Sequence, residues 1–207
     1  MTQRTSVDKP VILIATGNPG KVRELSGLLG GIEIEFKCLA DFPNVAEVPE
    51  TGSTFAENAR LKAVGYAFQT GIVSLADDSG LVVDALGGAP GVLSARYGGE
   101  IGFDRKMEML LAEMECAPDK IRSARFVCAM TIANENGEIL AAAEGVCEGR
   151  IAEAPRGNGG FGYDPIFVPD GYNNTFGELN DAEKQQISHR ARAAAKIMRY
   201  LLGFKPL

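Results

Sequence analysis

The order of hydrophobic and polar positions along the chain predicts strands that alternate with helices. The apolar run at 11–14 is typical of a buried strand, and residues 22–29 carry apolar side chains with the spacing of one helical face. A pair of glycines ends that helix, and the alternation over 32–36 predicts a second strand. The chain therefore begins with a strand, a loop, a helix and another strand.

The next segment combines a capped helix with a strand that leads into acidic residues. After a proline- and acid-rich loop over 41–53, Thr54 and Glu57 have the spacing of a capping box, which predicts a helix to about Gln69. A short buried strand is expected at 72–76. It is followed at once by two aspartates, a serine and a glycine.

Glycine-rich loops separate the predicted elements in the second half of the chain. Five glycines and a proline between 87 and 99 predict a shaped loop, and glycines cluster again over 156–165. Asn136-Gly137 favours a tight hairpin turn. The remaining predicted elements are a helix over 103–114, paired strands over 125–134 and 138–146, and a terminal helix over 181–202.

This mixture of elements predicts an α/β fold with a central mixed sheet. The 207 residues, 45% of them hydrophobic, suffice to bury a full core. The sequence contains no repeat, low-complexity tract or linker that would divide it. We therefore expect residues 1–207 to form a single domain.

Charge and cysteine usage exclude several classes of protein. Lys and Arg number 21 against 27 Asp and Glu, a net charge of 21 − 27 = −6, so we expect no sequence-blind nucleic-acid binder. No run approaches the roughly 18 apolar residues of a membrane span. With His189 as the only histidine and no CxxC spacing, neither a zinc site nor a disulfide framework is indicated. We expect a soluble cytoplasmic protein.

The first loop, Thr16-Gly17-Asn18-Pro19-Gly20-Lys21, has two interpretations. Small residues before a helix N-terminus allow backbone amides to approach a phosphate, and the lysine adds a full charge. An ordinary strand-to-helix turn is an equally good interpretation. The loop is not a Walker motif, because Ala15 stands where the first glycine should be and Val22 replaces Ser or Thr.

The acid pair after the buried strand indicates a metal site or a cap. Asp77 and Asp78 point to opposite faces in a strand, and buried carboxylates need a cation or donors. Mg²⁺, bound together with a phosphate substrate, would be such a cation, and Glu47, Glu50 or Glu57 could complete its ligands. Solvated acids that cap a turn are the alternative.

Aromatic and basic residues in the last third leave similar alternatives. Phe161 and Tyr163 lie between glycines, where a ring is either core filler or a stacking platform for a base. Lys184, His189 and Arg190 offer donors, although a charged segment of this kind is also typical of a solvated helix face.

Five sequence blocks together resemble the inosine triphosphate pyrophosphatase family. They are TGNPGKVREL, ETGSTFAENA, DDSGLVVDALGGAPGVLSARYGG, GGFGYDPIF and EKQQISHRARA, in the family's order from Ile14 to about Ala195. The resemblance implies a two-lobed fold with the active site in the cleft between the lobes, a homodimer, and Mg²⁺ as cofactor.

The resemblance also implies roles for individual residues. Asp78 would be the catalytic base and, with Glu50, a metal ligand; in many members two acids precede the Thr-Gly of the second block, whereas here Pro49 precedes Glu50. The residues that the resemblance places against substrate are Thr16, Gly17, Asn18, Pro19, Gly20, Lys21, Ser79, Phe161, Gly162, Tyr163, Asp164, Lys184, His189 and Arg190.

The implied reaction is hydrolysis of ITP, dITP or XTP to nucleoside monophosphate and pyrophosphate. Two other functions remain open from the residues alone. One is a P-loop-type NTPase or kinase that cleaves at the γ phosphate. The other is a regulatory nucleotide-binding module without turnover, against which the adjacent carboxylates argue.

Overall fold

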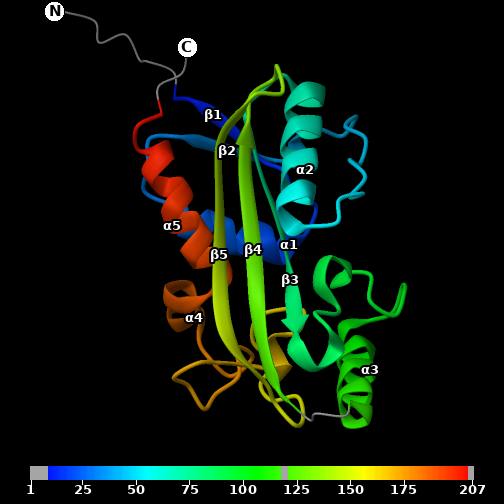
Figure 1. Cartoon of the computed structure of the whole chain (residues 1–207). Helices are drawn as coiled ribbons and strands as arrows, with labels where there is room; N and C mark the ends of the chain where they lie inside the picture. The colour runs from blue at the N-terminus through cyan, green and yellow to red at the C-terminus, as the bar shows by residue number, and fades with distance from the viewer. Residues whose placement is uncertain (1–8, 118–120, 205–207) are drawn as a thin grey trace, which may run out of the picture.

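A six-stranded mixed sheet in the order β2-β1-β3-β4-β5-β6 organises the protein (Figure 1). The computed structural model describes residues 9–117 and 121–204. β1 pairs in parallel with β2 and β3, and the other neighbours are antiparallel. The strands are β1 Val11–Ile14, β2 Glu35–Cys38, β3 Ser74–Val83, β4 Ser123–Ala133, β5 Ile139–Ile151 and β6 Phe167–Pro169.

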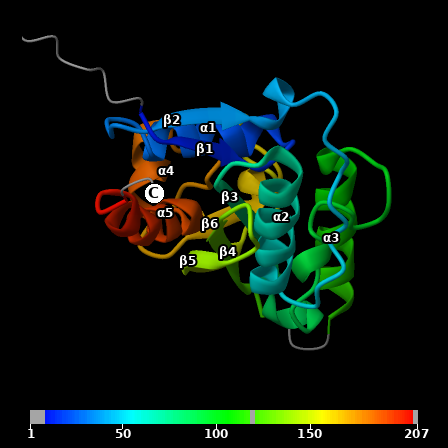
Figure 2. The same cartoon turned by 90° about the horizontal axis from the view of Figure 1, so that it is seen from above.

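Helices cover both faces of the sheet. α2 packs on β3 and β4, whereas α5 packs on the opposite side against β5 and β4 (Figure 2). The helices are α1 Pro19–Leu28, α2 Phe55–Thr70, α3 Phe103–Cys116, α4 Asp181–Ile187 and α5 His189–Leu201. Within the described ranges, none of them combines the length and apolar composition that crossing a membrane requires.

Three hydrophobic clusters divide the protein into two lobes joined by β4. Met130 belongs to the cluster beneath α1 and α5, and Ala133 to the cluster beneath α2. At the other end of β4, Phe126 packs on Phe167 with ring centroids 4.7 Å apart, in the cluster that includes α3 and β6. One continuous strand thus serves both lobes. The predicted α/β class, the mixed sheet and the two lobes are confirmed.

The structure corrects several predicted boundaries. The strand expected at 72–76 continues to Val83, so the acid pair lies inside β3. The terminal helix predicted over 181–202 is two helices, because Ser188 is extended at ψ 156° and its hydroxyl accepts the amide of Ala191 at 3.2 Å. β6 was not predicted. The hairpin at Asn136-Gly137 is confirmed, with Gly137 at φ 82°.

Candidate active site

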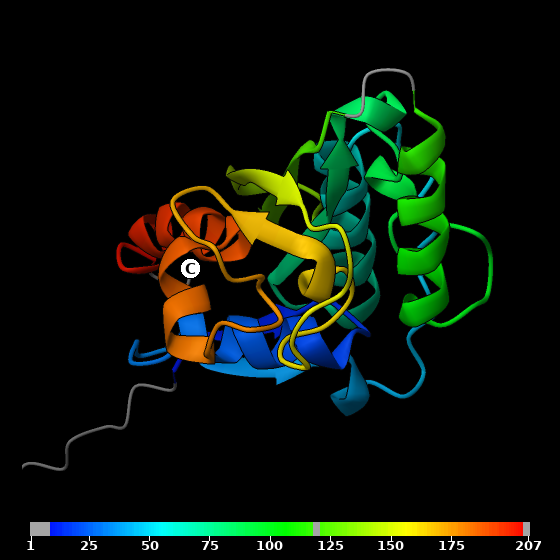
Figure 3. The ribbon, with the colours of Figure 1, turned by 90° about the horizontal axis from the view of Figure 1, so that it is seen from below.

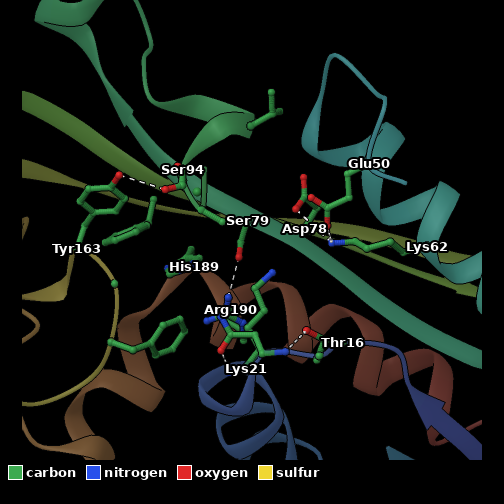
Figure 4. A pocket seen from close by; sticks show the side chains of 18 of the residues that line it. Thr16, Lys21, Glu50, Lys62, Asp78, Ser79, Ser94, Tyr163, His189 and Arg190 are labelled. Carbon is green, nitrogen blue, oxygen red and sulfur yellow. Dashed lines mark hydrogen bonds and ion pairs between the residues drawn. The ribbon is translucent and has the colours of Figure 1, made fainter. Parts of the chain in front are cut away.

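A cavity of about 430 Å³ lies between the lobes, where the predicted motifs meet (Figure 4). This volume is in the range of small-molecule sites. The predicted site residues that line it are Thr16, Gly17, Asn18, Lys21, Glu50, Asp78, Ser79, Phe161, Gly162, Tyr163, Asp164, Lys184, His189 and Arg190. Convergence of segments so distant in sequence makes this cavity the candidate active site.

Pro19 and Gly20 of the first loop do not line the cavity. They form the first turn of α1. A Cβ on Gly20 would lie 2.8 Å from the Phe161 ring, so Gly20 lets the glycine-rich loop approach α1. Figure 3 shows this glycine-rich segment, in yellow, beside the blue helix. In the structure, Gly20 therefore serves the close contact between α1 and the glycine-rich loop.

The amides of the first loop are largely satisfied within the loop itself. Asn18 caps α1, with its side-chain oxygen accepting the amides of Gly20 at 2.9 Å and Lys21 at 3.2 Å. The amide of Asn18 donates to the Thr16 hydroxyl at 3.2 Å. The charge that this loop presents to an anion is thus chiefly the Lys21 ammonium, rather than the cradle of amides that one of the two interpretations of its sequence expects.

The two aspartates of β3 point to opposite faces, as predicted. Asp77 is fully buried and its Oδ2 lies 3.1 Å from Lys21 Nζ and 3.2 Å from Arg190 Nη2. Asp78 faces α2, where Asn58 Nδ2 donates at 3.1 Å and Lys62 Nζ lies 3.3 Å away. Cations from distant parts of the chain therefore compensate both carboxylates, and the alternative of solvated acids is wrong.

These surroundings move the pKa values of the two aspartates in opposite directions. Burial raises the pKa of Asp77, but Lys21 and Arg190 outweigh it and hold the pKa well below its usual range. For Asp78 burial prevails over the attraction of Lys62 and Lys21, and its pKa is raised. Asp78 is thus the more basic of the two carboxylates, and it is the one that lines the cavity.

A chain of buried ion pairs continues from Asp77 into the C-terminal helices. Arg190, only 1% exposed, also pairs with Glu24 of α1. Lys184 Nζ lies 2.6 Å from Glu24 Oε1 and 2.6 Å from Asp164 Oδ2. Asp164 Oδ2 also accepts a hydrogen bond from the amide of Phe161 at 2.7 Å. A solvated helix face is therefore the wrong interpretation for Lys184 and Arg190. The chain ties the glycine-rich loop to α1 and β3.

The two aromatic residues of the glycine-rich loop have different environments. Tyr163 is core: its ring meets Phe103 edge-on at 5.3 Å and its hydroxyl donates to the Ser94 carbonyl at 3.1 Å. Phe161 is half-buried, with Lys184 Nζ 5.0 Å and Arg190 Cζ 5.6 Å from its ring centroid. Of the pair, Phe161 is the ring that can stack on a ligand.

His189 contributes a neutral ring to the cavity wall. Its imidazole stacks on Phe126 at 4.6 Å, and its Nδ1 has no hydrogen-bond partner among the described residues. Burial lowers its pKa well below the usual value, and Arg190 and Lys184 lower it further. One nitrogen is therefore a donor and the other an acceptor at neutral pH.

Comparison with known proteins identifies the family. A model of the Ham1 family matches residues 12–200. The chain belongs to the Ham1 family. It is 53% identical over 187 residues to a dITP/XTP pyrophosphatase of Geobacillus kaustophilus, covering 90% of this chain and 91% of the relative. It is 45% identical over 190 residues to a dITP/XTP pyrophosphatase of Halalkalibacterium halodurans, covering 91% and 97%.

A solved structure agrees with this assignment. The structure of a HAM1 protein from Coxiella burnetii matches with a TM-score of 0.87 and 42% identity, covering 94% of this chain and 100% of that one. The family that the five sequence blocks indicate is thereby confirmed.

The carboxylates of this Ham1 family member fit Mg²⁺ only in part. Glu50 and Asp78 both line the cavity, as does Glu47, but Glu57 is occupied in the capping box of α2. No group of three or more His, Cys, Asp and Glu side chains within 9–117 and 121–204 could hold a metal ion. Two carboxylates nevertheless suit Mg²⁺, because that ion is commonly completed by substrate phosphates and water.

Sequence reasoning missed three residues around the cavity. Asn58 and Lys62 contact Asp78, and Glu24 joins the C-terminal cations. A signal for the first two exists: they share the buried face of α2 with Ala59, Ala63 and Tyr66, where polar residues are unusual. Glu24 has no such signal, because its partners lie far away in sequence.

Proposed function

We propose that the chain hydrolyses the non-canonical purine nucleoside triphosphates ITP, dITP and XTP to nucleoside monophosphate and pyrophosphate, which removes them from the nucleotide pool. The curated relatives named dITP/XTP pyrophosphatases support this substrate class. The observation that carries the reaction type is the placement of Asp78, a carboxylate that is held by Asn58 at 3.1 Å and lines a cavity that also holds Lys21 and Lys62.

Asp78 is the general base in this proposal. Its raised pKa makes it a better proton acceptor than an ordinary aspartate, and the side-chain amide of Asn58 fixes its orientation. It orients and deprotonates the water that attacks the α phosphorus. Lys21 stabilises the pyrophosphate as its charge grows, since Lys21 lines the cavity and its side chain is partly accessible.

The other end of the cavity receives the purine. Phe161 provides a stacking face, and the buried donors Lys184 and Arg190 lie over it. A guanidinium is donor-only, so it suits the 6-oxo group of hypoxanthine or xanthine and opposes the amino group of adenine. Because Glu24 and Asp77 already hold Arg190, its contribution to the base is a fixed donor rather than a mobile one.

Mg²⁺, a homodimer and a cytoplasmic location belong to the same proposal. Glu50 and Asp78 would hold the ion, which supplies neutralisation of phosphate charge when bound. The remaining predicted contacts are those of Thr16, Gly17 and Asn18 with the phosphates and of Ser79, Gly162, Tyr163, Asp164 and His189 with the nucleoside. They rest on the family resemblance and on the grouping of these residues around the cavity, whereas contacts of Pro19 and Gly20 rest on the resemblance alone.

The test is a panel of nucleoside triphosphates incubated with Mg²⁺ and analysed for products. The proposal expects monophosphate and pyrophosphate from ITP, dITP and XTP, with much less from ATP. Diphosphate and orthophosphate would instead indicate cleavage at the γ phosphate. Binding without any product would indicate a regulatory module. Either of those outcomes would reject the proposed function.

A further inference from the structure

Lys62 occupies the space between the two carboxylates assigned to the metal. It projects from α2 into the cavity, and its Nζ lies 2.5 Å from Glu50 Oε1 and 3.3 Å from Asp78 Oδ1 (Figure 4). The residue is only 7% exposed. A single ammonium therefore bridges a carboxylate of the loop before α2 and a carboxylate of β3.

The surroundings fix this bridge. Asn58, one helical turn before Lys62, donates to the second oxygen of Asp78 at 3.1 Å. The second oxygen of Glu50 faces Arg96, at 3.7 Å. The carboxylate pair is thus already neutralised by protein cations, and any divalent cation that joins it meets like charge at short range.

We propose that Lys62 is an internal counter-ion that competes with the divalent cation for Glu50 and Asp78, so that the cation binds tightly only together with the triphosphate. This inference rests on the metal site of the proposed function. It adds an order of events: the nucleotide-free protein holds Lys62 between the carboxylates, and the cation gains access when substrate arrives.

Charge balance supports this order. A triphosphate brings several negative charges into a cavity that already contains Lys21 and Lys62. Those charges offset the ammonium once it no longer pairs with the carboxylates, and they supply the cation with further oxygen ligands. Without the triphosphate, displacing Lys62 would leave a buried cation without a partner, which is strongly unfavourable.

The experiment measures metal binding without catalysis. MgCl₂ is titrated calorimetrically into the nucleotide-free protein and into its Lys62→Met, Lys62→Gln and Lys62→Arg variants. Arg60→Met is the matched control, because Arg60 lies on the same helix, is exposed, and its loss changes the net charge equally. We expect the two neutral Lys62 variants to bind Mg²⁺ about tenfold or more tightly than the wild type, since a like charge is removed.

The remaining variants test whether the charge at position 62, and its pairing with Glu50, is responsible for the gain. Lys62→Arg and Arg60→Met should bind Mg²⁺ as weakly as the wild type, and adding Glu50→Gln to Lys62→Met should abolish the gain. Equal affinity of wild type and Lys62→Met, or an equal gain in Arg60→Met, would overturn the proposal.

A measurement on the wild type alone tests the proposal even if the variants fail to fold. The affinity for Mg²⁺ is measured without nucleotide and again with a saturating ITP analogue in which a methylene group replaces the α–β bridging oxygen. Binding of Mg²⁺ to the free analogue is measured separately and subtracted. Equal affinity in both states would also overturn the proposal. Neither titration follows hydrolysis, so product analysis judges the proposed function separately.

Discussion

Glu24→Gln tests whether the buried ion chain stabilises the protein. The Glu24 carboxylate accepts Lys184 at 2.6 Å and pairs with Arg190 through its other oxygen. Glutamine keeps the size of the side chain but offers one acceptor oxygen, while its amide N–H₂ opposes a cation on the other side. The substitution therefore removes one charged contact and weakens the second.

The expected loss follows from the partners that remain. Lys184 keeps Asp164 at 2.6 Å and Arg190 keeps Asp77 at 3.2 Å, so neither cation is stranded. Complete rupture of a buried pair costs about 3–5 kcal/mol, and one hydrogen bond to a charged group contributes about 1.5–3 kcal/mol. We expect the free energy of unfolding to fall by about 2–4 kcal/mol at pH 7.

The effect of pH has a definite sign. Burial raises the pKa of Glu24, but Arg190 and Lys184 outweigh it and the pKa is lowered from 4.5. A carboxyl with a lowered folded-state pKa stabilises the protein above its unfolded pKa, and that contribution is lost as the pH falls through the folded value. The difference between wild type and Glu24→Gln should therefore be full at neutral pH and shrink below 4.5.

Urea denaturation followed by circular dichroism at several pH values measures both effects. Glu33→Gln is the matched control, because Glu33 has a side chain that is 89% exposed and pairs only at the surface with Lys9. It should unfold like the wild type. A loss below about 0.5 kcal/mol for Glu24→Gln, the range of ordinary surface substitutions, would refute the reasoning. A loss that did not change with acidification would refute the assigned charge.

Three further predictions concern the cavity. Asp78→Asn should remain folded and bind nucleotide but lower kcat by about 10²–10⁴-fold, because the amide cannot accept the proton; steady-state kinetics retaining a tenth of wild-type turnover would contradict this. Lys21→Ala should weaken triphosphate binding much more than monophosphate binding in calorimetry, and an equal loss for both would remove Lys21 from the phosphate site. Gly145→Ala should lower the free energy of unfolding by about 1–3 kcal/mol and slow turnover, because the added Cβ would collide with the backbone of His189 and Ala193. Thermal melting measures this loss, and an unchanged melting temperature would contradict the prediction.

Local patterns in the sequence predicted most elements but misjudged the central strand. Residues 72–76 are apolar, whereas Asp77 and Asp78 are of the kind that usually ends a strand. They continue β3 because Lys21 and Arg190 neutralise one carboxylate and Lys62 the other. Those partners lie up to 113 residues away, so no local window contains them.

The boundary at Ser188 is different, because its signal was present. A serine hydroxyl that caps the third residue after it is a common start of a helix, and Ser188 does this for α5. The alanine-rich composition of the segment concealed the break. For the site, the five sequence blocks located most of the cavity-lining residues. Lys62 had a signal that was overlooked, its place on the apolar face of α2, whereas nothing near Glu24 in the sequence marks its distant partners.

The ion chain between α1 and the C-terminal helices also has a consequence for biosynthesis. Glu24 meets Lys184 across 160 residues and Arg190 across 166. Contacts of such sequence separation form late. While α4 and α5 are still inside the ribosome, Glu24 cannot reach its partners. Before α5 has been synthesised, Ile12 and Leu25 lack the apolar side chains of α5 that pack in the same cluster. We therefore expect the apolar cluster around Ile12 and Leu25 to stay incompletely covered until the segment that forms α5 has been synthesised.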